Sequence, residues 1–174
     1  SLFLKKKLQI LLKRKFEYIY SSKNVGLPKA SNILLKKVKS KYLLFTQADI
    51  LINKKSVTEL VKIFKKDKDI IFVTPSMNTK MYNTTKKNNI SYVKNIKAAC
   101  MVCDVKKLKK IGFFDEDFFL YWEDVFLEKK INLSNYKMAI AMNAFVKHNS
   151  SQSSEKNFKT DFIRDSNFIY GELV

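Results

Sequence analysis

Five carboxylates lie within ten residues of a chain that has only 16 acidic residues. They are Asp115, Glu116, Asp117, Glu123 and Asp124, in the segment GFFDEDFFLYWED, which also contains six aromatic residues. A carboxylate held among aromatic rings is poorly hydrated, which raises its pKa towards neutrality and suits a general base. Aromatic faces also suit stacking against a sugar or a base. The segment is therefore a candidate catalytic site, although core aromatics with a solvated acidic rim would give the same pattern.

Asp49 is a second candidate because it follows Tyr42–Phe45, an apolar run typical of a strand buried on both faces. In open α/β sheets, ligands bind beyond the carboxyl ends of the strands. A carboxylate there can coordinate a divalent cation that carries a diphosphate, because such cations prefer oxygen ligands. A helix N-cap is the alternative role. Ser56, with Glu59 three residues later, forms a capping-box pattern that suits the next helix better.

His148 is the only histidine and also follows an apolar stretch, but a lone histidine is more often structural than functional. Cys100 and Cys103 form a single C-x-x-C in an apolar segment, without a second pair for zinc. We therefore interpret both cysteines as core residues. The sequence has no Walker loop, no G-x-G-x-x-G and no G-x-S-x-G, so the common nucleotidase, dinucleotide-binding and hydrolase classes lack support.

Hydrophobic periodicity predicts alternating elements in the first half of the chain. The expected helices are 2–15, 28–39 and 56–64, and the expected strands are 16–20, 42–45 and 70–73. Such alternation indicates an α/β fold with a mostly parallel sheet flanked by crossover helices. The second half is predicted to contain a loop over 78–95, strands over 98–105 and 138–146, helices over 105–111 and 125–132, and a helical tail within 155–174. We expect one domain over 1–174.

The net charge of +18 allows two further classes of function. Arginine supplies only two of the 34 basic residues, whereas proteins that read nucleic acid rely on arginine. An AT-rich coding sequence would also give this lysine content, so we expect no nucleic-acid partner, with a basic nucleic-acid-binding module as the alternative. The basic amphipathic helix over 2–15 either packs on the sheet, which we favour, or lies on a membrane surface. No apolar run is long enough to span a membrane, and no signal peptide is recognisable, which predicts a cytoplasmic location.

Four segments in order resemble motifs of one enzyme family. Asn24-Val25-Gly26 with Ala30 and Asn32 resembles N-x-G-x-x-x-A-x-N, and the strand ending Gln47-Ala48-Asp49 resembles a D-x-D-type motif. The segment 111–124 closely resembles G-G-F-D-E-x-F-F-x-Y-x-E-D, and Val146-Lys147-His148 with Ser151 and Ser153 resembles V-x-H-x-x-G-x-S. These are motifs of the inverting, nucleotide-sugar-dependent family 2 glycosyltransferases with the Rossmann-like GT-A fold, and of their rhamnosyltransferase-like branch in particular.

The resemblance implies a function and a set of site residues. The substrates would be a nucleotide-sugar donor and a glycan or lipid-linked acceptor, in the synthesis of cell-envelope polysaccharide. The chain would be cytoplasmic, with peripheral contact at the inner face of the membrane. Mg²⁺ or Mn²⁺ would be the cofactor. The implied roles are Asp124 as catalytic base with Glu123 beside it, Asp49 and His148 as metal ligands, Tyr121 and Trp122 as acceptor residues, and Asn24, Gly26, Asn32, Gln47 and Asp49 as donor-binding residues.

The sequence also departs from the family pattern. Gln47-Ala48 stands where the branch commonly has Asn-Pro, Phe113 replaces a glycine, and Phe126 replaces an acidic residue. The family begins with a strand, a helix and a second strand that form the nucleotide base pocket, and the first residue here, Ser1, follows them. We therefore expect a domain that is incomplete at its N-terminus. An inactive glycosyltransferase fragment is the alternative to an active enzyme.

Overall fold

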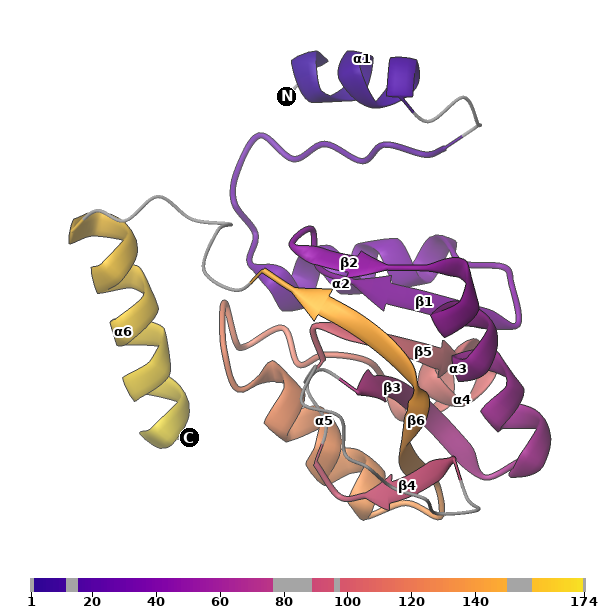
Figure 1. Ribbon diagram of the computed structural model, residues 1–174. Helices are drawn as coiled ribbons and strands as arrows, with labels where there is room; N and C mark the ends of the chain where they lie inside the picture. Colours follow the sequence, from indigo (N-terminus) through magenta and orange to yellow (C-terminus); the bar gives the residue numbers. More distant parts are fainter. Residues whose placement is uncertain (1, 12–15, 77–88, 96–97, 150–157, 174) are drawn as a thin grey trace.

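The computed structural model describes residues 2–11, 16–76, 89–95, 98–149 and 158–173 of the chain (Figure 1). The helices in this part are α1 (Leu2–Leu11), α2 (Leu27–Lys37), α3 (Lys54–Lys66), α4 (Val105–Ile111), α5 (Glu123–Asn132) and α6 (Phe158–Leu173). The strands are β1 (Tyr42–Thr46), β2 (Ile50–Ile52), β3 (Ile70–Ser76), β4 (Ile90–Val93), β5 (Cys100–Asp104) and β6 (Lys137–His148).

The strands form a mixed sheet in the order β1-β5-β3-β6-β2, and β4 also pairs with β6. β3 and β6 are parallel neighbours, whereas β5 runs antiparallel between β1 and β3. The α/β class is confirmed, but the prediction of a mostly parallel sheet is wrong. Helix–strand alternation correctly implies that β1 and β3 share a direction. It cannot reveal that β5, from later in the chain, separates them, because pairing between distant segments leaves no local signal.

Helices cover both faces of the sheet and bury a hydrophobic core. α3 packs Leu60 and Ile63 against one face, in a cluster that includes Val73 of β3. α2, α4 and α5 cover the other face, in a cluster that includes Leu127 and Ile131 of α5. Leu60 and Ile131 are completely buried, and burying one such side chain contributes roughly 1.5–3 kcal/mol. This packing holds the central strands, and the residues at their ends, in position.

The N-terminal segment differs from the prediction. Residues 16–20 lie outside any strand, because alternating aromatic residues favour an extended backbone but a strand also requires a paired neighbour. α1 lies apart from the sheet in Figure 1, with Phe3, Ile10 and Leu11 exposed. The expectation that this helix packs on the sheet is therefore wrong, and its predicted continuation over 12–15 lies outside the described residues.

Smaller corrections concern strand burial, a loop and a helix start. β1 is only partly buried because it forms an edge of the sheet, so it is not buried on both faces. β4 falls within the predicted loop, of which residues 77–88 lie outside the description. Asn53, and not Ser56, caps α3, with its side-chain oxygen accepting a 2.8 Å hydrogen bond from the Ser56 amide. The Ser56 hydroxyl instead donates to the Phe145 carbonyl at 2.7 Å and joins α3 to β6.

None of the described helices is both long enough and apolar enough to cross a bilayer.

Candidate functional site

The topology places Asp49 and His148 at one edge of the sheet. β1 and β6 run in the same direction, so the turn that follows β1 and the end of β6 lie at the same side. β2 begins immediately after Asp49 and pairs with the end of β6, with Ile50 opposite His148. Two residues that are far apart in the sequence are thereby brought into contact.

The Asp49–His148 pair combines a buried carboxylate with an imidazole. Nε2 of His148 lies 3.4 Å from Oδ2 of Asp49, and the Asn149 amide donates to the Asp49 carbonyl at 3.0 Å. The Asp49 side chain is 11% exposed, and its Oδ1 is buried with no hydrogen-bond partner among the described residues. An unpartnered buried oxygen is costly, so Oδ1 of Asp49 is a position that a bound ion, a ligand or a water molecule can satisfy.

The donor set suits a divalent cation only in part. A carboxylate oxygen and an imidazole nitrogen are metal ligands, but the described residues contain no cluster of three or more such groups. Mg²⁺ in proteins is commonly held by one or two carboxylates together with water and substrate phosphates. Asp49 and His148 therefore supply at most two ligands, and water or substrate phosphates would have to supply the others.

The Gln47 backbone holds the turn that carries Asp49. The Gln47 amide donates to the Ala99 carbonyl at 2.9 Å, and the Gln47 carbonyl accepts from the Ile50 amide at 3.4 Å.

The two cysteines lie in the neighbouring strand β5. Cys100 and Cys103 are free and completely buried, and burial raises the pKa of both thiols. The prediction that they are core residues is confirmed.

The acidic segment ends in a strained turn that begins α5. Tyr121 and Trp122 have φ values of 66° and 65°, a left-handed conformation that bulky side chains rarely adopt. Trp122 occupies the N-cap of α5 without a side-chain cap. Such residues cost on the order of 1–3 kcal/mol each and concentrate at functional sites. The strain therefore marks the start of α5, where Glu123 and Asp124 lie, as a site candidate.

Glu123 and Asp124 occupy different environments although they are neighbours. Glu123 is 7% exposed, and its Oε2 is buried with no hydrogen-bond partner among the described residues. Burial raises the pKa of the Glu123 carboxyl to about 7, and the charge of Asp124 acts in the same direction. Asp124 is half-buried, and its Oδ1 accepts a 3.0 Å hydrogen bond from the Val125 amide in the first turn of α5. A helix N-terminus favours a negative charge, so the two groups together suit acid–base chemistry.

Two of the residues predicted to bind the donor near α2, Gly26 and Asn32, contact the acidic segment. The Asn32 amide nitrogen donates to the Phe114 carbonyl at 2.9 Å and to Oε1 of Glu116 at 3.0 Å. Gly26 has a φ of 80°, and a Cβ there would lie 2.6 Å from the Phe119 carbonyl oxygen. Asn24 accepts from the Gly26 amide at 3.1 Å and shapes this turn. Sequence reasoning missed these positioning contacts, for which the local pattern contains no signal.

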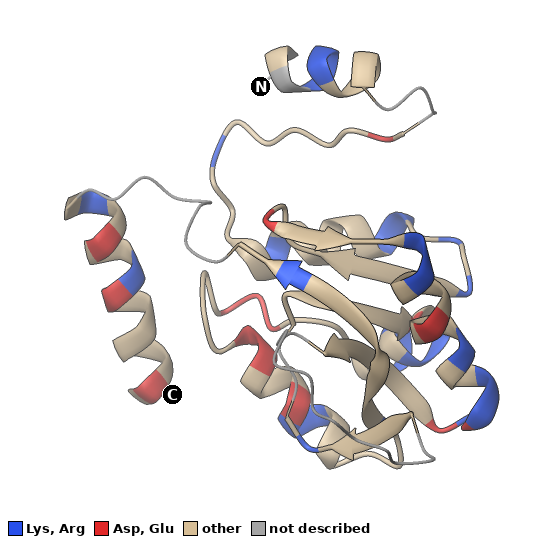
Figure 2. Cartoon of the chain, viewed as in Figure 1, with Lys and Arg blue, Asp and Glu red and all other residues tan. Residues whose placement is uncertain are grey.

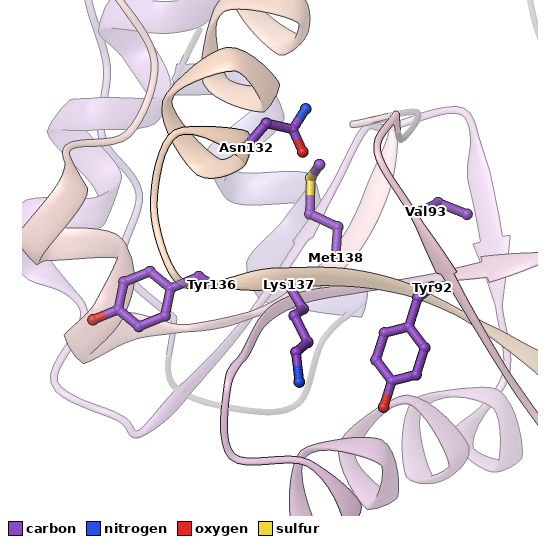
Figure 3. Close-up of a pocket in the computed structure, with 6 residues that line it drawn as sticks. All are labelled: Tyr92, Val93, Asn132, Tyr136, Lys137 and Met138. Atoms are coloured by element: carbon purple, nitrogen blue, oxygen red, sulfur yellow. The ribbon is translucent and has the colours of Figure 1, made fainter.

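A pocket of about 450 Å³ lies away from these residues, at the start of β6 (Figure 3). It is lined by Tyr92, Val93, Asn132, Tyr136, Lys137 and Met138. The Lys137 ammonium and the Tyr92 hydroxyl both bond to Asp67, at 3.1 and 2.9 Å. At about 3.3 Å per residue, β6 carries the chain roughly 36 Å from here to His148. Figure 2 shows the other end, where acidic residues occupy the loop before α5 and its first turn.

A comparison with family models identifies the family of the chain. Residues 3–128, more than half of the chain, match the sequence model of Glycosyl transferase family 2. No curated protein is significantly similar to the chain.

Solved structures share the fold. The crystal structure of GalNAc-T7 with UDP, GalNAc and Mn²⁺ matches with a TM-score of 0.70 and 13% identity, over 84% of this chain and 34% of that one. The structure of S. aureus TarS 1-349 in complex with UDP-GlcNAc matches with a TM-score of 0.58 and 16% identity, over 94% of this chain and 51% of that one. The chain thus spans about a third to a half of the proteins that it matches.

Proposed function

Because the chain belongs to glycosyl transferase family 2, we propose that it transfers a sugar from a nucleoside diphosphate donor to a glycan or lipid-linked acceptor, with inversion at the anomeric carbon. The observation that carries the proposal is the contact between Asp49 and His148, in which a buried carboxylate oxygen lacks a partner. The family motifs predict that these residues meet at the donor diphosphate.

On the donor side, Asp49 and His148 would hold Mg²⁺ or Mn²⁺, which neutralises charge on the diphosphate leaving group when bound. Two structures with the same fold contain UDP with Mn²⁺, or UDP-GlcNAc, which supports a uridine nucleotide as the donor. Gln47 fixes the turn that positions Asp49, while Gly26 and Asn32 hold the segment that leads to the acceptor side.

On the acceptor side, Asp124 would take the proton from the attacking hydroxyl. The hydroxyl oxygen then forms its bond to the anomeric carbon as the bond to the diphosphate breaks, in a single displacement. Glu123 is protonated for a substantial fraction of the time near pH 7, since its pKa is raised to about 7. A protonated Glu123 cannot take up the acceptor proton, which leaves that role to Asp124.

A finer assignment follows from the motifs alone. The resemblance of 111–124 and 146–153 to the rhamnosyltransferase-like branch supports a deoxyhexose or hexose donor and an acceptor in cell-envelope polysaccharide. Synthesis there would place the enzyme at the cytoplasmic face of the membrane. The exposed apolar residues Phe3, Ile10 and Leu11 of α1 are consistent with peripheral contact.

Release of UDP from a panel of UDP-sugars with saccharide acceptors tests the proposal. Asp124→Asn should lower the acceptor-dependent rate by about 10²–10⁴-fold, the usual contribution of a general base. Asp117→Asn is the matched control, because Asp117 is an exposed carboxylate of the same segment and its loss should leave the rate unchanged. Equal rates in the wild type and Asp124→Asn would contradict the role of Asp124.

A further inference from the structure

α6 docks against the two residues that precede Glu123. The Trp122 indole Nε1 donates to the Phe168 carbonyl at 3.0 Å, and the two rings lie 5.7 Å apart. The Phe168 ring also meets Tyr121 at 6.3 Å. Figure 1 shows α6 alongside the loop that leads into α5. This contact joins the C-terminal part of the described chain to the proposed acceptor side.

The contact requires a glycine. Gly171 is buried, and a Cβ at this position would lie only 2.0 Å from Cδ1 of Trp122. Glycine inside a helix costs roughly 1 kcal/mol relative to alanine, so its presence is explained by the indole that fills the space. Trp122 is itself held in a left-handed conformation. A glycine within a helix and a left-handed tryptophan, each locally unfavourable, therefore lie in one contact. Their pairing indicates that α6 docks in a specific geometry.

The docked face leaves aromatic surface accessible. Tyr170 meets Phe118 at a ring distance of 6.2 Å, and Phe118 packs on Phe126 of α5 at 4.5 Å. Phe168 and Tyr170 remain 49% and 48% exposed. Both residues thus keep accessible surface next to the turn that carries the two carboxylates.

We propose that Phe168 of α6, positioned by its edge contact with Tyr121, forms an aromatic platform that stacks against a sugar ring of the acceptor. Trp122 anchors this platform through Gly171. The apolar face of a pyranose complements an aromatic ring. Tyr121 lies three residues before Asp124 in the sequence, and Phe168 contacts Tyr121 and Trp122. Phe168 is then a specificity-determining residue for the acceptor. The inference rests on the proposed function, and it gives the Trp122 indole, an expected acceptor residue, the role of an anchor for α6.

The test uses the fluorescence of Trp122, which is the only tryptophan in the chain. Methyl glycosides of glucose, galactose, N-acetylglucosamine and rhamnose are titrated into the wild type, and at least one should change the emission saturably. Phe168→Ala should weaken that response about 3- to 10-fold, the loss expected for one aromatic stack. Phe162→Ala is the matched control, because Phe162 is 63% exposed on the same helix and stacks on Phe158.

Further variants separate stacking from anchoring. Phe168→Tyr retains the ring and should retain the response. Gly171→Leu should displace α6, shift the emission of the free protein to longer wavelength and abolish the response to glycosides. The platform is refuted if no glycoside changes the emission, or if Phe168→Ala responds as the wild type does. Unchanged emission in Gly171→Leu would refute the anchor.

The same samples are tested for Mn²⁺-dependent stabilisation by UDP, which involves the Asp49 side of the site. Stabilisation by UDP without a glycoside response refutes the platform alone. A glycoside response without stabilisation by UDP supports the platform and counts against the proposed donor chemistry.

Discussion

The carboxylates at the two ends of strand β6, called here the two edges of the sheet, differ in their hydrogen bonding. At the edge where β1 and β6 end, Asp49 and Glu123 each have a buried carboxylate oxygen without a hydrogen-bond partner among the described residues. At the edge where β6 begins, the Asp67 carboxylate accepts bonds from the Tyr92 hydroxyl, the Lys137 ammonium and the Asp69 amide. The pocket in Figure 3 lies at this second edge, where Tyr92 and Lys137 already bond to Asp67. The candidate site is therefore identified by carboxylate oxygens without hydrogen-bond partners, and not by the presence of a pocket.

This difference predicts that substitutions at the two edges change the free energy of unfolding in opposite directions. Removing charge at the first edge should stabilise the fold and impair function, whereas removing a partner at the second edge should destabilise the fold and spare function. The following substitutions test this contrast, beginning with the largest expected change in unfolding free energy.

Glu123→Gln should stabilise the protein at alkaline pH. The folded-state pKa of about 7 lies above the usual value of 4.5, so the folded wild type binds more protons than the unfolded chain and loses stability as pH rises from about 4.5 to 7. Glutamine removes this penalty, which amounts to about 3 kcal/mol at pH 8. Urea unfolding at pH 5 and pH 8 measures it. A variant that is no more stable than the wild type at pH 8 would refute the buried-charge account of Glu123.

Asn32→Ala should lower stability by roughly 1–3 kcal/mol, because the backbone N–H and C=O of the buried residue Phe114 both lose their bonds to this side chain. Asn24→Ala is the control, since Asn24 is exposed and serves only its own turn. Thermal unfolding compares the two. Equal effects would mean that Asn32 does not hold the acidic segment.

Asp67→Ala should cost about 1 kcal/mol at neutral pH and leave UDP binding unchanged. A hydrogen bond from the Asp69 amide, with bonds from Tyr92 and Lys137, lowers the pKa of Asp67, so this stabilisation is present above pH 3.8 and is lost as pH falls through the folded-state pKa. Unfolding at pH 7 and pH 3 measures the loss. Asp69→Ala should cost less, because Asp69 is 64% exposed and meets Lys137 at 3.4 Å.

Sequence reasoning predicted those parts of the molecule that depend on local pattern. The apolar run at 42–45, the helix at 105–111 and the strand at 138–146 all correspond to elements of the structure. The family resemblance implied that Asp49 and His148 act together as metal ligands, and the two side chains are in contact.

Features that depend on distant partners were not predictable. β5 lies between β1 and β3 through non-local pairing, and residues 16–20 have the composition of a strand but lie outside one. Asn32 was interpreted as a donor-binding residue, yet its hydrogen bonds go to Phe114 and Glu116, more than eighty residues later. The left-handed turn at Trp122 has no sequence signal, because it is stabilised by the packing of α6.

The most direct test of the central claim is isothermal titration of UDP with and without Mn²⁺. The wild type should bind UDP only with the metal, and Asp49→Asn should weaken this binding at least tenfold, since loss even of an outer-shell partner typically costs 10–100-fold in metal sites. Asp69→Asn, at the opposite edge, should bind as the wild type does. Metal-independent binding of UDP, or unchanged binding by Asp49→Asn, would contradict the assignment of Asp49 and His148 to the donor diphosphate.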